Sequence, residues 1–146
     1  GLGGTGAANI LDDYEEGTFT PILRNSGGEQ PNAYGVAVGF YTKIGHLVHI
    51  TGVVSANGLA SASGAVQLGG LPFDSVSTGN NLSSFQISHA VGLNITAGHS
   101  LGGFLPANTT FAEVFIYDAA AGVTNLQFSE LSADGQLIFA CQYRTA

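Results

Sequence analysis

Apolar and polar residues alternate along most of the chain after Gly17, with the two-residue period of β-strands. Residues 34–44 are the clearest case, because one side of the expected strand carries bulky apolar residues: Tyr34, Val36, Val38 and Phe40. A turn at residues 43–45 leads into a second alternating segment, residues 46–54. These two segments predict a β-hairpin.

Shorter alternating segments separated by turn residues predict the remaining strands. These segments are residues 17–23, 65–68, 85–91, 100–105, 111–117, 123–128 and 137–143. With the hairpin they make about nine strands, spaced as in a sandwich or barrel. No window predicts a helix, because the 22 glycines and many Ser, Thr and Asn residues interrupt every 3.6-residue pattern. We therefore predict an all-β fold, an antiparallel β-sandwich of jelly-roll-like form.

The alternation also predicts where the domain begins. Residues 1–16 read as a glycine-rich linker or stem end that finishes in an acidic turn, and residues 17–146 as the β-sandwich domain. The turn holds Asp12, Asp13, Glu15 and Glu16, which could together bind calcium. Their spacing differs from that of a calcium loop, so we favour a solvated turn and expect no metal or cofactor.

The chain carries few charges for its size. Charged residues make up 9% of it, apolar residues make up 45%, and the mean hydropathy is +0.27. No stretch approaches the ~20 apolar residues of a membrane helix, so we expect no membrane insertion. The segment 111–117 is apolar on both of its faces, and a strand of that kind needs cover on each side. We therefore expect the excess apolar surface to meet other copies of the chain.

The balance of charge excludes another class of partner. The net charge is −7, and the fixed cations are Arg24, Lys43 and Arg144, too few to neutralise a row of phosphates. Nucleic acid is therefore not an expected partner. The single cysteine, Cys141, cannot form an intrachain disulfide. Because the sequence has no methionine, we expect Gly1 to follow a longer upstream segment.

Residues 98–102 match the G-x-S-x-G nucleophile motif of α/β-hydrolases. All four histidines precede Ser100, however, and Pro106 prevents the helix that must follow the serine. Catalytic carboxylates are the other enzymatic option, with Glu113 and Asp118 among the available residues. We predict that the chain is not an enzyme.

Exposed aromatic rings beside amides and carboxylates can bind carbohydrate, because a ring packs against the apolar face of a sugar. The candidate ligand residues are Tyr34, Tyr41 and Tyr117, with Tyr143 as a further one. For each of them a place in the core or in a subunit interface fits equally well. The absence of tryptophan weakens the carbohydrate interpretation.

Four motifs carry a family resemblance. They are LDDYEEGTFTP at residues 11–21, GFYTKIGHLV at residues 39–48, GLPF at residues 70–73 and CQYR at residues 141–144. Together they resemble the C-terminal domain of many tail fibre and tailspike proteins of tailed bacteriophages. The resemblance implies a homotrimeric β-sandwich in the virion, facing the outside, with upstream fibre or tail proteins as partners. Residues 75–110 match only in character, and no catalytic residues carry over.

The function that this resemblance implies is trimerisation and host-surface contact, with a glycan or a protein as receptor. We expect loops 56–64 and 75–84 to make that contact, and the trimer or stem contacts to involve Leu11, Tyr14 and Phe19. One alternative is a fragment of a polysaccharide-degrading depolymerase. Another is a head or neck fibre decoration without a receptor role.

Overall fold

The computed structural model describes residues 13–31, 33–78 and 82–146. The expectations for residues 1–12, Leu11 and Asp12 among them, and for residues 79–81 of the second loop lie outside this part. In order, the strands are β1 (Tyr14–Phe19), β2 (Ile22–Asn25), β3 (Gly28–Glu29), β4 (Tyr34–Ile44), β5 (Leu47–Ala56), β6 (Gln67–Gly69), β7 (Ser83–Leu93), β8 (Leu101–Leu105), β9 (Ala112–Ala119), β10 (Gly122–Asn125) and β11 (Leu131–Arg144). A short 3₁₀ turn, η2 (Phe128–Glu130), precedes β11.

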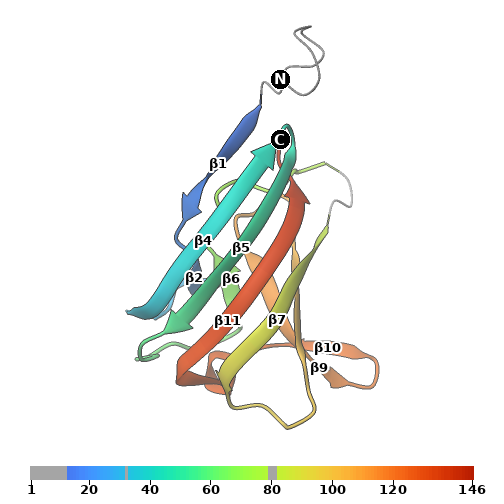
Figure 1. The fold of residues 1–146 in the computed structure, drawn as a ribbon. Coiled ribbons are helices and arrows are strands. Elements are labelled where there is room, and N and C mark those ends of the chain that lie inside the picture. Colours follow the sequence, from blue (N-terminus) through green and yellow to red (C-terminus); the bar gives the residue numbers. More distant parts are fainter. Residues whose placement is uncertain (1–12, 32, 79–81) are drawn as a thin grey trace, which may run out of the picture.

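All these strands belong to one antiparallel sheet that curls on itself. Its strand order is β1-β4-β5-β11-β7-β8-β9-β6-β2-β3, with β10 paired to β9. Strands β4, β5, β11 and β7 run side by side across one layer, with β2, β6 and β9 behind them (Figure 1). The predicted all-β, antiparallel fold is confirmed, with the two layers formed by a single continuous sheet.

The layers enclose one apolar core. Strands β5, β7 and β11 of the first layer bury Ile50, Phe85, Phe139 and several neighbours. The second layer contributes Leu23, Leu68, Leu105, Val114 and Ile116. Alternation along each strand places these residues on one face, which faces the core. The predicted β4–β5 hairpin is confirmed. Ile44 pairs with Leu47 next to the turn, and the pairing continues from there along both strands.

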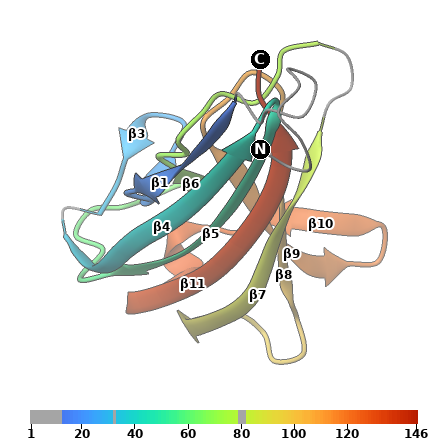
Figure 2. The same cartoon turned by 45° about the horizontal axis from the view of Figure 1, so that its top comes forward.

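The predicted strand 17–23 is wrong, because it is two strands at different ends of the sheet. Strand β1 pairs with β4, whereas β2 pairs with β6. The chain leaves the first ladder at Thr20 and Pro21, and proline cannot donate a ladder hydrogen bond. This two-residue connection leads from β1, which Figure 2 shows beside β4 in the first layer, to β2 beside β6 in the second.

Two further boundaries differ from the sequence prediction. Glu15 and Glu16 lie within β1 and not in an acidic turn, because the strand begins three residues before Gly17, at Tyr14, and extends along β4. The expected strand 123–128 ends at Asn125, and Phe128 enters the 3₁₀ turn. There the Glu130 side chain accepts a hydrogen bond from the backbone N–H of Gln127 at 2.8 Å.

Aromatic rings cover glycines on the inner face of the first layer. Across four neighbouring strands the register aligns Phe19, Gly39, Gly52 and Phe139. The Phe19 ring lies against Gly39 and the Phe139 ring against Gly52, with the two ring centroids 6.3 Å apart. Glycine in a strand marks such a close approach, because a Cβ would occupy the space of the ring.

We expect Gly52→Ala to destabilise the fold by about 1–3 kcal/mol through overpacking. A Cβ on Gly52 would lie 2.5 Å from Cζ of Phe139 and 2.9 Å from the Val38 carbonyl oxygen. Urea unfolding at fixed protein concentration measures the loss. The control is Ser88→Ala, at an exposed position on β7, which should change stability by less than about 0.5 kcal/mol. Equal midpoints for Gly52→Ala and the wild type would contradict the packing argument.

Candidate functional site

The four sequence motifs meet around Phe73. The Tyr41 ring contacts the Phe73 ring edge-on at a centroid distance of 5.2 Å, and Lys43 Nζ lies 5.9 Å from the centroid of the same ring. The Tyr143 hydroxyl donates a hydrogen bond to the Phe73 carbonyl oxygen at 3.1 Å. Gly70 adopts φ +77°, and a side chain there would collide with the Thr20 carbonyl oxygen. These motif residues therefore hold the corner at which the sheet closes.

Two of the three described acidic residues of the first motif, Asp13 and Glu15, bind side chains of the second. Lys43 Nζ forms an ion pair with Asp13 Oδ1 at 2.7 Å, and the Tyr41 hydroxyl donates to Glu15 Oε1 at 2.6 Å. The hydrogen bond to Glu15 raises the pKa of Tyr41, since it favours the protonated phenol. Glu16 points to the opposite face of β1 from Glu15 and accepts a hydrogen bond from Tyr14.

These carboxylates do not form a metal site among themselves. Within residues 13–31, 33–78 and 82–146, no group of three or more His, Cys, Asp or Glu side chains could hold a metal ion. The alternating faces of β1 separate Glu15 from Glu16, which explains why neighbours in sequence do not converge.

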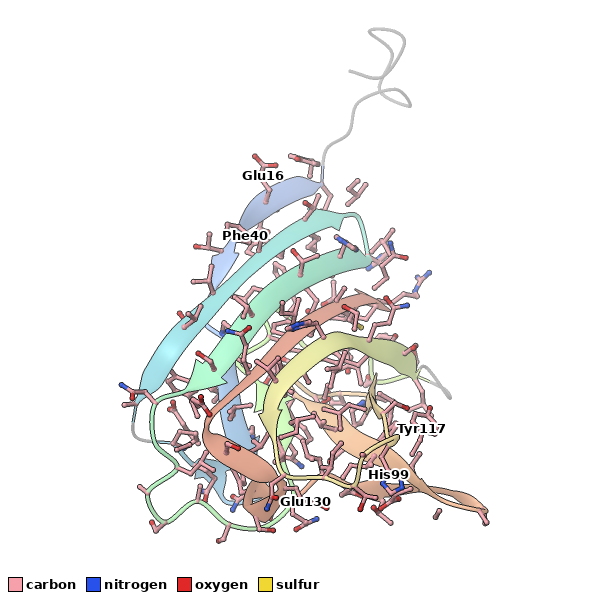
Figure 3. The ribbon with its side chains drawn as sticks, turned by 60° about the horizontal axis from the view of Figure 1, so that its bottom comes forward. Glu16, Phe40, His99, Tyr117 and Glu130 are labelled. Carbon is pink, nitrogen blue, oxygen red and sulfur yellow. The ribbon has the colours of Figure 1, made fainter. Side chains whose placement is uncertain are left out.

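The three candidate ligand tyrosines lie in different surroundings. The Tyr34 hydroxyl accepts a hydrogen bond from the Leu23 N–H at 2.9 Å and donates to the Leu23 carbonyl oxygen at 3.3 Å. Burial raises the pKa of Tyr34, and likewise the pKa of Tyr143. Tyr34 and Tyr41 therefore use their hydroxyls within the fold. Tyr117 is 56% exposed and lies on the opposite side of the molecule from Phe40 (Figure 3).

Tyr117 is held in place by an aromatic cluster on the outer face of β8 and β9. Its ring meets the Phe115 ring edge-on at a centroid distance of 6.0 Å, and Phe115 lies 6.0 Å from Phe104. Both Tyr117 and Phe115 lie over Gly102, where a Cβ would be 2.8 Å from Cε2 of Tyr117. The absence of a side chain on Gly102 therefore lets the exposed ring lie close to the strand.

A groove opens beside this ring. In the described part of the chain, the β7–β8 ladder covers only residues 83–85 and 103–105, after which the strands separate. The resulting space has a volume of about 360 Å³, and we call it the Tyr117 groove. Its lining consists of Ser84, Phe85, Gln86, Ile87, Ser88, Leu101, Gly102, Gly103 and Tyr117.

A second feature is an apolar face on the outside of β4, β5 and β11. It consists of exposed Val36, Val38, Phe40, Ile44, Leu47 and Ile138. The register places Val38, Val53 and Ile138 side by side, and Ile44 beside Leu47. Strands β4 and β5 contain no aspartate or glutamate, and nor does β11 from Gln136 to its end. This apolar face is therefore free of acidic residues although the whole chain has ten.

The predicted subunit contacts divide between the two faces of β1. Tyr14 is 49% exposed on the outer face. Phe19 faces inward, is half-buried and packs against Phe139 of the same chain, and its role in a subunit contact stays a prediction. Strand alternation explains the difference, since Tyr14 and Phe19 are five residues apart and so point to opposite faces.

The candidate catalytic motifs do not form the geometry that their chemistry needs. Ser100 precedes strand β8, whereas a nucleophile elbow leads into a helix. Glu113 and Asp118 are five residues apart on β9, which separates them by about 17 Å along the strand. Paired glycosidase carboxylates lie only about 5–10 Å apart. These two carboxylates accept hydrogen bonds instead, Glu113 from Gln67 and Asp118 from Thr124.

Sequence reasoning named Tyr117 as a candidate and included Ser84 in loop 75–84, but it missed the other lining residues of the Tyr117 groove. Gln86 on β7 and Gly102 on β8 lie just beyond the paired residues 83–85 and 103–105, and only this long-range pairing brings them together. One available signal was the pair Gly102–Gly103 within a predicted strand, since interior glycines mark close approaches. In the described part of the chain, no helix has the length and apolarity to cross a membrane.

Comparison with known proteins gives one likeness of fold. No protein-family model and no curated protein sequence matches the chain. The structure is similar to the crystal structure of the Dettilon tailspike protein (gp208), with a TM-score of 0.73 and 20% sequence identity. The match covers 90% of this chain and 24% of the tailspike chain, so this chain spans about a quarter of that protein. The fold is thus one that a phage tailspike contains.

Cys141 faces the core and should be chemically inert. Burial raises the pKa of its thiol to about 12, and Sγ donates to the Ser84 carbonyl oxygen at 3.2 Å. At pH 8 we expect the folded chain to react with a disulfide reagent at least about 100-fold more slowly than the unfolded chain, because the thiolate is the reactive form. A thiol-release assay with and without denaturant measures this difference.

The same pKa shift makes a prediction about stability. The folded chain favours the protonated Cys141 thiol. The stability that this preference contributes is therefore complete below about pH 8.5 and declines as the pH rises toward 12. Fast labelling of the native chain at pH 8 would contradict both expectations. Cys141→Ala is the control, since it removes the reactive group and this part of the alkaline decline.

Proposed function

We propose that the chain is a homotrimeric module of a phage tail fibre or tailspike that contacts the host surface. The observation that carries the proposal is the apolar face, together with the four motifs and the tailspike fold. The family resemblance of the motifs supports a stoichiometry of three and a place in the virion, with upstream fibre or tail proteins as neighbours. The apolar face supplies the surface through which copies associate.

Charge favours a second copy of the chain as the occupant of the apolar face. The chain has a net charge of −7, so contacts through most of its surface would bring carboxylates of different copies together. The apolar face lessens this repulsion, because β4, β5 and the second half of β11 carry no acidic residue and only Glu16 on β1 borders the face near Phe40. Exposed apolar side chains that lie side by side, as around Val38 and Ile138, mark interaction surfaces in soluble proteins.

Phe40 is the expected centre of the contact. It is 56% exposed, stands between Thr18 and Thr51 on the neighbouring strands, and has Val38 on its own strand. Large aromatic residues near the middle of an interface supply most of the binding energy in protein complexes. Tyr14 on the outer face of β1 extends the same surface toward the sheet edge.

We expect the wild-type chain to sediment at three times 14.8 kDa at micromolar concentration, and Phe40→Asp to sediment as a monomer. The substitution places a carboxylate in the apolar contact and should weaken association by more than about 30-fold. Tyr117→Asp is the matched control, because Tyr117 is also 56% exposed and lies on the opposite side of the molecule. It should leave the trimer intact.

Two results would overturn the assembly part of the proposal. One is a monomeric wild-type chain, and the other is equal dissociation by Phe40→Asp and Tyr117→Asp. Host contact has its own test, in which the fluorescently labelled trimer binds the bacteria that the parent phage infects. Purified surface glycan from those bacteria should compete with that binding if the receptor is a glycan, and a lack of cell binding would contradict a receptor role.

A further inference from the structure

We propose that the Tyr117 groove binds one sugar ring of a glycan that carries no negative charge. The inference rests on the proposed function, since it names the ligand class and the place of host contact. It keeps Tyr117 from the sequence expectation but places the site between two strands, and of the expected loops 56–64 and 75–84 only Ser84 lines the groove. The groove's volume of about 360 Å³ is at the lower end of the range for small-ligand pockets, about 300–1,000 Å³, and so suits a single small unit.

The aromatic wall of the groove is rigid and accessible. Tyr117 exposes 56% of its surface, yet its ring is supported by Phe115 and lies directly over Gly102. A ring fixed in this way loses little conformational entropy when a ligand stacks on it. The face of a pyranose ring, with its axial C–H groups, is the complementary surface for an aromatic ring.

The opposite wall supplies hydrogen-bonding groups for hydroxyls. Ser84, Gln86 and Ser88 are exposed on β7 and line the groove. Their hydroxyl and amide groups both donate and accept, as sugar hydroxyls do. Beyond Phe85 the edge of β7 that faces β8 has no ladder partner in the described part of the chain, so its backbone groups are also available.

Electrostatics restricts the sugar to one without a carboxylate, phosphate or sulfate. None of the residues that line the groove is Asp, Glu, Lys or Arg. Glu113 and Asp118 lie on β9, the strand that carries Tyr117, and the chain as a whole has a charge of −7. An anionic sugar would meet this negative field with no cation in the groove to compensate.

The other grooves fit a sugar less well. The groove formed by Glu16, Gly17, Thr18, Phe40, Tyr41 and Thr42 includes the centre of the apolar face, where we propose that copies associate. The Tyr41 hydroxyl in that groove is already bonded to Glu15. A third groove, formed by His49, Ser84, Gln86, Ala140, Cys141 and Gln142, has no Tyr or Phe ring.

The test is an NMR titration of the ¹⁵N-labelled chain with methyl glucoside, methyl galactoside and methyl N-acetylglucosaminide. Glucuronic acid is the anionic counterpart. We expect at least one neutral glycoside to shift the amide signals of Gly102 and Gly103, and glucuronic acid to bind at least about tenfold more weakly. Binding that maps away from the Tyr117 groove, or equal binding of glucuronic acid, would overturn the proposal.

Variants separate the role of the ring from that of the fold. Tyr117→Ala should weaken binding by about tenfold or more, whereas Tyr117→Phe, which keeps the stacking surface, should stay within about threefold of the wild type. Gln86→Ala, at an exposed position, should also weaken binding. Unchanged affinity in Tyr117→Ala would overturn the proposal, as would a loss in Tyr117→Phe equal to that in Tyr117→Ala.

The Phe40→Asp variant distinguishes failure of this inference from failure of the proposed function. Every residue of the Tyr117 groove comes from one chain, so the dissociated variant should bind the glycoside with the wild-type affinity. Loss of binding in that variant would overturn the single-chain site. A wild-type trimer that attaches to host cells but binds none of the three glycosides would overturn the inference and leave the proposed function standing.

Discussion

The closure of the sheet depends on the corner where Thr20 and Pro21 meet Gly70 and Phe73. Strands β1 and β2 are consecutive in the chain but lie near opposite ends of the strand order. Two residues can join them only if the sheet curls until its ends are close. Gly70 permits that approach because it has no side chain, and Phe73 then packs against Tyr41 from the other layer. The motif residues thus specify how the two layers meet, which explains why they are dispersed along the whole sequence.

Aromatic rings pack over glycines on both the inner and the outer face of the curled sheet. Glycine weakens a strand, since it has no side chain to pack and loses much entropy on folding. Here rings from neighbouring strands fill the vacant positions: Phe19 covers Gly39, Phe139 covers Gly52, Tyr41 covers Gly17 and Tyr117 covers Gly102. In the first three pairs the ring helps the fold. In the fourth it remains exposed, so a rigid aromatic surface faces solvent at the edge of a groove.

Strong alternation made the fold predictable. Which face of each strand points to the core did not follow from the sequence. Residues 34–44 were correctly predicted as a strand paired with the next one. Both faces of that strand carry aromatic residues, however, so the pattern could not show that Phe40 points outward and Tyr41 inward. The break at Pro21 was missed because Phe19 and Leu23 keep the alternation on both sides of it. The groove beside Tyr117 depends on where β7 and β8 stop pairing, and this long-range register leaves no local signal in either segment.

The separation of the two surfaces has a consequence for binding strength. The apolar face ends at β11, the Tyr117 groove begins at the next strand, β7, and Figure 3 places Phe40 and Tyr117 on different sides of the molecule. Association through the apolar face would therefore leave three grooves open at the outside of a trimer. A site of one sugar ring binds weakly, because a small contact barely exceeds the entropic cost of association. Three such sites on one rigid particle bind a repeating surface glycan more tightly by effective concentration. In this arrangement assembly itself supplies the affinity that a shallow groove on a single chain lacks.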